Sequence, residues 1–141
     1  MKKVAVIYWS GTGNTEEMAK AVAEGAKNGQ TEVTLLSVSE ATADTVKNAD
    51  AIALGCPSMG AEVLEESEME PFVASIESLV SGKPLALFGS YGWGNGEWMQ
   101  DWAARMTENG ASLVGEGLII MNTPDDSGLE ECKALGSKLS G

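Results

Sequence analysis

Residues 4–15 run Val-Ala-Val-Ile-Tyr-Trp-Ser-Gly-Thr-Gly-Asn-Thr, and this stretch indicates how the chain is built. Its first six residues are apolar and rich in β-branched side chains, which predicts a strand buried on both faces. The small, hydroxyl-bearing residues that follow predict a turn, after which Asn14 or Thr15 can cap a helix. A buried strand that leads through a glycine-containing turn into a helix is typical of a parallel α/β sheet.

The same alternation continues along the chain. Apolar runs predict further strands at residues 32–36, 51–55, 85–89 and 118–121. Between them lie apolar stripes at helical spacing, namely Met18/Val22/Ala26, Phe72/Val73/Ile76/Leu79/Val80, Trp98/Trp102/Met106 and Leu129/Cys132/Leu135/Leu139. We therefore predict an α/β fold: a doubly wound, five-stranded parallel sheet with helices on both faces, formed by residues 1–141 as one domain.

Composition excludes several classes of function. With 9 Lys and Arg against 21 Asp and Glu, the chain carries a net charge of −12, which disfavours nucleic acids and anionic membrane surfaces. It has no histidine, so histidine-based catalysis and metal ligation are excluded, and its two cysteines lie too far apart in sequence for a cluster motif. We assign Cys56 and Cys132 to the core and predict no metal site. No apolar run is long enough for a signal peptide or a membrane span, so we expect a cytoplasmic protein.

Glycines mark where a ligand is expected to bind. Eight of the 17 glycines lie at or just beyond the ends of three predicted strands, at positions 11, 13, 55, 60, 89, 92, 94 and 96. Because ligands of open α/β sheets bind beyond the carboxyl ends of the strands, this distribution predicts one composite site.

The first loop has the chemistry of a phosphate site without a cation. Backbone N–H groups at a helix start, the hydroxyls of Ser10, Thr12 and Thr15 and the amide of Asn14 can surround a terminal phosphate. The loop has no lysine, so it is not the loop of a nucleoside triphosphatase. Ordinary helix capping by the same residue types is the alternative.

The second and third loops offer flat or polarisable side chains among small ones. Met59 and Trp93 can flank a planar aromatic ligand, and Glu62 can accept a hydrogen bond from an N–H of that ligand. Trp98 and Trp102 lie at helical spacing, so we assign them to the core.

These three loops together resemble those of short-chain flavodoxins of the clostridial type. The segments that carry the resemblance are Tyr-Trp-Ser-Gly-Thr-Gly-Asn-Thr at 8–15, Met-Gly-Ala-Glu-Val-Leu-Glu-Glu-Ser at 59–67 and Gly-Ser-Tyr-Gly-Trp-Gly at 89–94. The resemblance implies a flavodoxin-like fold, non-covalent FMN and a carrier of single electrons. The flavin-facing loops offer no cation and the chain carries a charge of −12, so the anionic, fully reduced flavin is disfavoured and we expect a low-potential carrier that cycles between semiquinone and hydroquinone. The resemblance further implies that Gly60 has the peptide that turns over on reduction. Ala61 stands where relatives often have an acid.

The resemblance also implies a set of cofactor-binding residues. These are Ser10, Gly11, Thr12, Gly13, Asn14, Thr15, Ser58, Met59, Gly60, Ala61, Glu62, Ser90, Tyr91, Gly92, Trp93, Gly94 and Asn122.

Partners follow from the same resemblance and from the charge. We expect a monomer that exchanges electrons with basic-patched redox proteins, such as reductases and the oxidoreductases normally served by ferredoxin. The acids expected near the flavin are Glu62, Glu65, Glu66, Glu68, Glu70, Glu97 and Asp101, which form either a docking surface or an ordinary solvated helix start.

Two other functions remain as alternatives. An FMN-dependent NAD(P)H:quinone reductase has the same fold, although such enzymes are usually longer. A signalling receiver domain needs paired acids after the first strand, where this chain has Ser10 and Gly11.

Overall fold

A computed structural model describes residues 2–11, 13–59, 63–92 and 94–140. The strands are β1 (Lys2–Tyr8), β2 (Thr31–Ser37), β3 (Ala51–Gly55), β4 (Pro84–Tyr91), β5 (Ser112–Leu113) and β6 (Leu118–Met121). The helices are α1 (Asn14–Ala26), α2 (Ala43–Asn48), α3 (Met69–Ile76), α4 (Glu97–Glu108) and α5 (Asp126–Ser140). Strands and helices alternate through most of the chain, as the sequence predicts.

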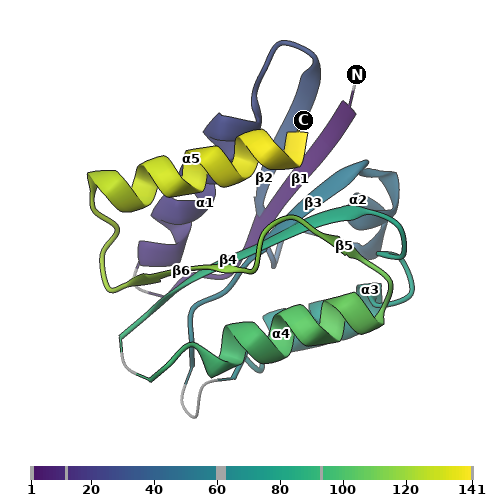
Figure 1. Ribbon diagram of the computed structural model, residues 1–141. Helices are drawn as coiled ribbons and strands as arrows, with labels where there is room; N and C mark the ends of the chain where they lie inside the picture. The colour runs from purple at the N-terminus through teal and green to yellow at the C-terminus, as the bar shows by residue number, and fades with distance from the viewer. Residues whose placement is uncertain (1, 12, 60–62, 93, 141) are drawn as a thin grey trace.

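The strands form one parallel sheet in the order β2-β1-β3-β4-β5 (Figure 1). The fifth position is shared by two short segments, because β5 pairs with the start of β4 and β6 with its end. The doubly wound five-stranded fold is thus confirmed, with its last strand interrupted at residues 114–117.

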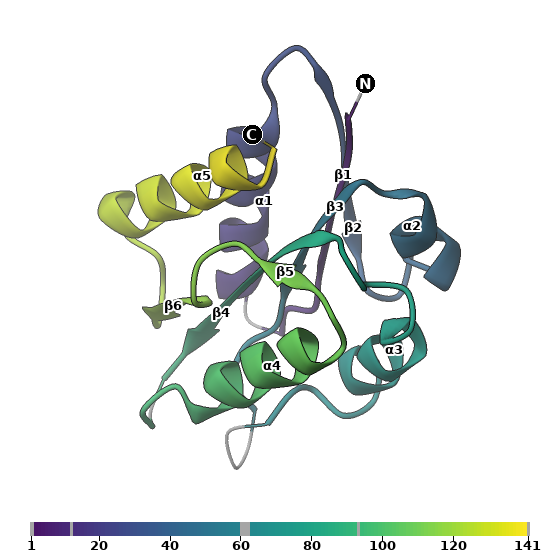
Figure 2. The same ribbon diagram turned by 45° about the vertical axis from the view of Figure 1, so that its right-hand side comes forward.

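Helices cover both faces of the sheet (Figure 2), with α1 and α5 on one face and α2, α3 and α4 on the other. Alternate residues of β1 feed the two layers: Val4 and Val6 pack toward α1 and α5, whereas Ala5 and Ile7 pack toward the other three helices. Every residue of β3 is buried, which explains why its sequence is a continuous apolar run.

Two predicted helix features differ from the structure. Gly13, in the left-handed region at φ 96°, occupies the N-cap position of α1, where Asn14 or Thr15 was expected. Helix α3 ends at Ile76, so Leu79 and Val80 belong to the following turn although they still pack in or against the core.

The expected core residues are in place. Trp98, Trp102, Cys56 and Cys132 are all buried. Burial raises the pKa of the Cys56 thiol to about 12, so this thiol stays protonated and inert at neutral pH. Among the helices that the structure describes, none combines the length and apolar character needed to cross a bilayer.

Candidate functional site

A pocket of about 290 Å³ lies where the carboxyl ends of β1, β3, β4 and β6 meet. Its described lining consists of Trp9, Gly11, Asn14, Pro57, Ser58, Met59, Ser90, Tyr91, Gly92 and Asn122. Eight of these ten residues are among the predicted cofactor-binding residues, drawn from all three glycine-rich loops and from the segment after β6. None of these lining residues is charged.

The loop between β1 and α1 is organised by Ser10. Its hydroxyl accepts hydrogen bonds from the N–H groups of Gly13 (3.1 Å) and Glu16 (3.3 Å), so it caps the first turn from outside the helix. The left-handed conformation of Gly13 lets the chain turn directly into α1. As a result, the positive end of α1 faces the loop that the sequence assigns to a phosphate.

Thr15 links this loop to the end of β4. It is fully buried, its hydroxyl lies 3.1 Å from the Ser90 hydroxyl, and it accepts the Ser90 N–H at 3.4 Å. The pair fixes α1 against the sheet at the base of the pocket. Thr15 therefore has a structural contact in addition to its predicted role toward a phosphate.

The end of β3 forms the second wall. Pairing with β4 continues past β3 itself, because the N–H groups of Cys56 and Ser58 donate to Phe88 and Ser90 at 3.1 and 3.0 Å. A Cβ on Gly89 would lie 2.1 Å from the Cys56 carbonyl oxygen, so glycine is needed where these strand ends approach. Trp98 Nε1 donates to that same oxygen at 3.1 Å and ties α4 to this wall.

Ser58 carries the observation that most directly indicates a ligand. Its hydroxyl oxygen is buried in the pocket wall and has no hydrogen-bond partner in the part of the chain that the structure describes. Buried hydroxyls are normally paired, and an unpaired one in a pocket wall is the kind of group that a bound ligand satisfies.

The third wall comes from the ends of β4 and β6. Asn122 adopts a left-handed conformation (φ 58°), and its N–H donates to the Tyr91 carbonyl at 2.7 Å. Tyr91 also contacts Trp98, with ring centroids 5.8 Å apart. Gly92 lies beside Asn122, where a Cβ would be 3.5 Å from its Oδ1.

The predicted site residues fall into three groups. Those in the lining are Gly11, Asn14, Ser58, Met59, Ser90, Tyr91, Gly92 and Asn122. Ser10, Gly13 and Thr15 organise the first loop, and Gly94, at φ 87°, follows the third wall without being part of the described lining. Thr12, Gly60, Ala61, Glu62 and Trp93 lie outside the described residues.

Trp9 and Pro57 line the pocket but were not predicted. The apolar run predicts that Trp9 belongs to the first strand, but β1 ends at Tyr8. The Trp9 ring instead lies over Gly11, where a Cβ would be 3.1 Å from the ring. The position of Trp9 directly before the hydroxyl-rich loop is the feature of the sequence that could have indicated a place in the pocket.

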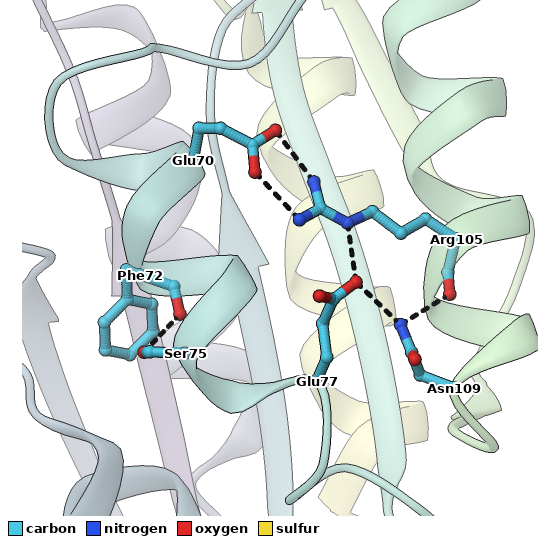
Figure 3. Close-up of polar contacts among 6 residues, drawn as sticks. All are labelled: Glu70, Phe72, Ser75, Glu77, Arg105 and Asn109. Atoms are coloured by element: carbon cyan, nitrogen blue, oxygen red, sulfur yellow. Dashed lines mark hydrogen bonds and ion pairs between the residues drawn. The ribbon is translucent and has the colours of Figure 1, made fainter.

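An ion-pair network joins α3 to α4 (Figure 3). The Arg105 guanidinium binds both carboxylate oxygens of Glu70 at 2.8 Å and donates through Nε to Glu77 at 2.9 Å. Hydrogen bonds from Arg105, and then from Asn109, lower the pKa of the Glu77 carboxyl. Glu70 is thus paired with Arg105, which it shares with Glu77, and Glu65 is only 6% exposed, so neither acid is an unpaired surface charge.

The lining suits FMN. The described part of the lining is uncharged, and its apolar or flat side chains, amides and hydroxyls match a flavin ring and ribityl chain. The neutral donors and helix start of the first loop match a single terminal phosphate.

Comparison with known proteins agrees with this geometry. The flavodoxin family model matches residues 6–136. The chain is 47% identical to a flavodoxin of Clostridium beijerinckii, with 96% of this chain and 97% of the relative covered, and 44% identical to that of Megasphaera elsdenii, at 94% and 95%.

Solved structures give the same result. The two-electron reduced Megasphaera elsdenii flavodoxin superposes with a TM-score of 0.87 at 43% identity, covering 97% of this chain and 98% of that one. A flavodoxin from the domain Archaea superposes with a TM-score of 0.89 at 34% identity, covering 98% and 96%. The chain therefore belongs to the flavodoxin family, and it is an FMN-containing, low-potential electron carrier rather than an enzyme.

Proposed function

We propose that residues 1–141 form a single FMN-binding domain whose working step is the more reducing of the two one-electron reductions of FMN. FMN, when bound, would accept and donate electrons one at a time. The observation that carries the proposal is that no cation is found among the described residues lining the pocket, in a chain of net charge −12. The flavin becomes an anion on full reduction at neutral pH, and this lining offers no cation to stabilise it. The second electron is therefore added at low potential.

The residues have distinct roles in this proposal. Ser10, Gly11, Thr12, Gly13, Asn14 and Thr15 bind the phosphate, with Ser58, Ser90 and Asn122 toward the ribityl chain. Met59 and Trp93 would flank the ring, Glu62 would accept a hydrogen bond from its N3–H, and the peptide of Gly60 would offer its carbonyl to N5. Tyr91, Gly92 and Gly94 would complete the backbone around the ring, and Ala61 belongs to the proposed set without an assigned contact.

Stepwise anaerobic reduction with visible spectroscopy tests this function. We expect a yellow protein that is reduced in two separate one-electron steps, with the second at the lower potential. Bleaching in a single two-electron step would refute the proposed working step. Failure of the purified protein to bind added FMN would refute the proposed site.

The partners, in this proposal, are redox proteins with basic docking patches. Four exposed acids flank the site on α4 and on the segment before α3, namely Glu66, Glu68, Glu97 and Asp101. Complementary charge would speed encounter at low ionic strength.

A pair of charge-matched variants tests the docking surface. Replacing Glu97 and Asp101 by Gln and Asn should slow reduction of a basic partner, such as a ferredoxin-dependent reductase, and flatten the salt dependence of the rate. The control replaces Glu24 and Glu32 by Gln, two exposed acids at the opposite end of the sheet. Equal effects of the two double variants would show that only net charge matters.

A further inference from the structure

Glu65 is a buried acid in a chain whose other acids are largely at the surface. Its side chain lies just before α3, where Oε1 accepts the N–H groups of Glu68 (2.7 Å) and Met69 (3.1 Å). Oε2 accepts the N–H of Ser67 at 2.9 Å and also the Ser67 hydroxyl. Burial raises the pKa of this carboxyl, but the four hydrogen bonds outweigh burial and lower it, so Glu65 is ionised at neutral pH.

The arrangement requires a carboxylate. Both oxygens of Glu65 face donors, and a carboxylate can accept at both. A glutamine would place its NH₂ group against backbone N–H groups at one of the two positions. An aspartate keeps the charge but is one methylene shorter, so it cannot reach the same donors from the same backbone position.

The backbone of Glu65 holds the other side of the same junction. Its N–H donates to Cys56 Sγ at 3.4 Å, and its carbonyl accepts the Glu70 N–H at 2.8 Å. One residue thus connects the end of β3 with the start of α3. The preceding residue, Leu64, is buried in the core and holds the same segment in place.

This junction leads directly to the pocket wall. Val63, two residues before Glu65, pairs with Met59 in an antiparallel bridge, with both N–H···O distances at 3.0 Å. Met59 lines the pocket. The two stems of the loop after β3, residues 56–59 and 63–65, are therefore held together at Met59–Val63 and again at Cys56–Glu65.

We propose that Glu65 is a positioning residue for the flavin: its carboxylate holds the Val63–Glu65 stem against α3, and through the bridge this stem sets the position of Met59. The proposal rests on the FMN site proposed above. It goes further than a helix cap, because the N-cap residue of α3 is Glu68, whose own side chain makes no capping bond. The capping group instead comes from the stem of the flavin-side loop.

Three variants distinguish the effect of where the Glu65 carboxylate lies from the effect of its charge. Glu65→Gln removes the charge and one acceptor, Glu65→Asp keeps the charge but loses reach, and Glu66→Gln removes the charge of an exposed neighbour. Ser67→Ala, which removes only the hydroxyl donor, is a milder variant should either Glu65 variant fail to fold. The measurements are amide hydrogen exchange of the purified protein, FMN affinity, and the separation between the two one-electron reduction potentials.

We expect the Met59 and Val63 amides to exchange about tenfold faster in Glu65→Gln and Glu65→Asp, because charged hydrogen bonds of this strength are lost. Ala53, in the middle of β3, should keep its protection. FMN affinity should fall about tenfold in both variants, and the separation of the potentials should change in both. Glu66→Gln should resemble the parent in exchange and affinity.

Two results would overturn the proposal. If Glu65→Asp matches the parent in exchange and potentials, Glu65 acts through its charge alone. If the Met59 and Val63 amides keep their protection in both variants, the carboxylate does not hold the stem. A parent protein that binds no FMN would instead refute the site proposed above, and the amide exchange would still decide whether Glu65 holds the loop.

Discussion

Replacing Gly136 by alanine should separate two helices that are packed backbone to backbone. Gly136 lies in α5, and a Cβ there would be 2.0 Å from the Val22 carbonyl oxygen of α1 and 2.9 Å from the Ala26 nitrogen. Gly25 of α1 makes the reciprocal contact, since its Cβ would lie 2.0 Å from the Lys133 carbonyl oxygen. Neither obstacle is a flexible side chain, so relief requires movement of a helix.

The cost follows from the size of that movement. A normal carbon–oxygen contact needs about 3.4 Å, so the helices must move apart by more than 1 Å. A gap of about 1 Å already forfeits a quarter to a half of each dispersion contact in an interface. Overpacking of this kind costs about 3 kcal/mol, and the better helix propensity of alanine returns about 1 kcal/mol. We therefore expect Gly136→Ala to lower the free energy of unfolding by about 2 kcal/mol.

Urea unfolding followed by circular dichroism measures this loss, with Gly128→Ala in the same helix as the control. A Cβ on Gly128 would meet the end of the flexible Ile120 side chain at 2.9 Å, so we expect a change below about 1 kcal/mol. Gly25→Ala combined with Gly136→Ala should cost less than the two single changes added together, because one displacement relieves both contacts. A Gly136→Ala variant as stable as Gly128→Ala would refute the reasoning.

Three further predictions concern the site and its flank. Ser58→Ala should leave the stability of the FMN-free protein unchanged, because the Ser58 hydroxyl has no partner among the described residues. The same variant should bind FMN about tenfold more weakly in a fluorescence titration. Unchanged affinity would show that this hydroxyl does not contact the ligand. Arg105→Lys keeps the charge but loses the two-pronged contact with Glu70, so urea unfolding should show a loss of about 1 kcal/mol, small because Glu70 is 44% exposed. The folded pKa of Glu65 is lowered, so its stabilisation is fully present above the ordinary value of 4.5 and is lost as the pH falls through the lowered value. The urea midpoint should therefore decrease below about pH 4.5 and decrease less in Glu65→Gln; equal decreases would contradict this assignment.

The sheet was predictable because its central strands are buried on both faces. The run at residues 51–55 is apolar at every position, and the structure buries every one of them. Two elements were not predicted. Helix α2 has six residues of which only Val46 is buried, and β5 has two residues, so neither is long enough to show a periodic pattern.

The location of the site was predictable for a topological reason. The carboxyl ends of parallel strands meet at one edge, so glycine-rich loops after three strands had to lie close together. The contacts of Glu65 were not predictable, because they depend on the path by which the loop returns to α3. The glycines at 25 and 136 were also missed, since a glycine inside a helix shows its reason only once the opposing helix is known.

The electrostatic character of the pocket arises from where the few cations lie. Lys83 binds the carbonyls at the end of α2, and Arg105 is held by two carboxylates between α3 and α4. None of the described Lys and Arg side chains lines the pocket.

Among the described lining residues, the polar groups are backbone, amide and hydroxyl groups, which can orient a cofactor without stabilising an added negative charge. In the proposed site, cofactor binding and a low reduction potential are compatible, because hydrogen bonds to the phosphate and ribityl chain would supply affinity far from the ring where the charge appears. A cation at the ring would strengthen binding of the reduced form and raise its potential together, and the arrangement of this lining separates those two effects.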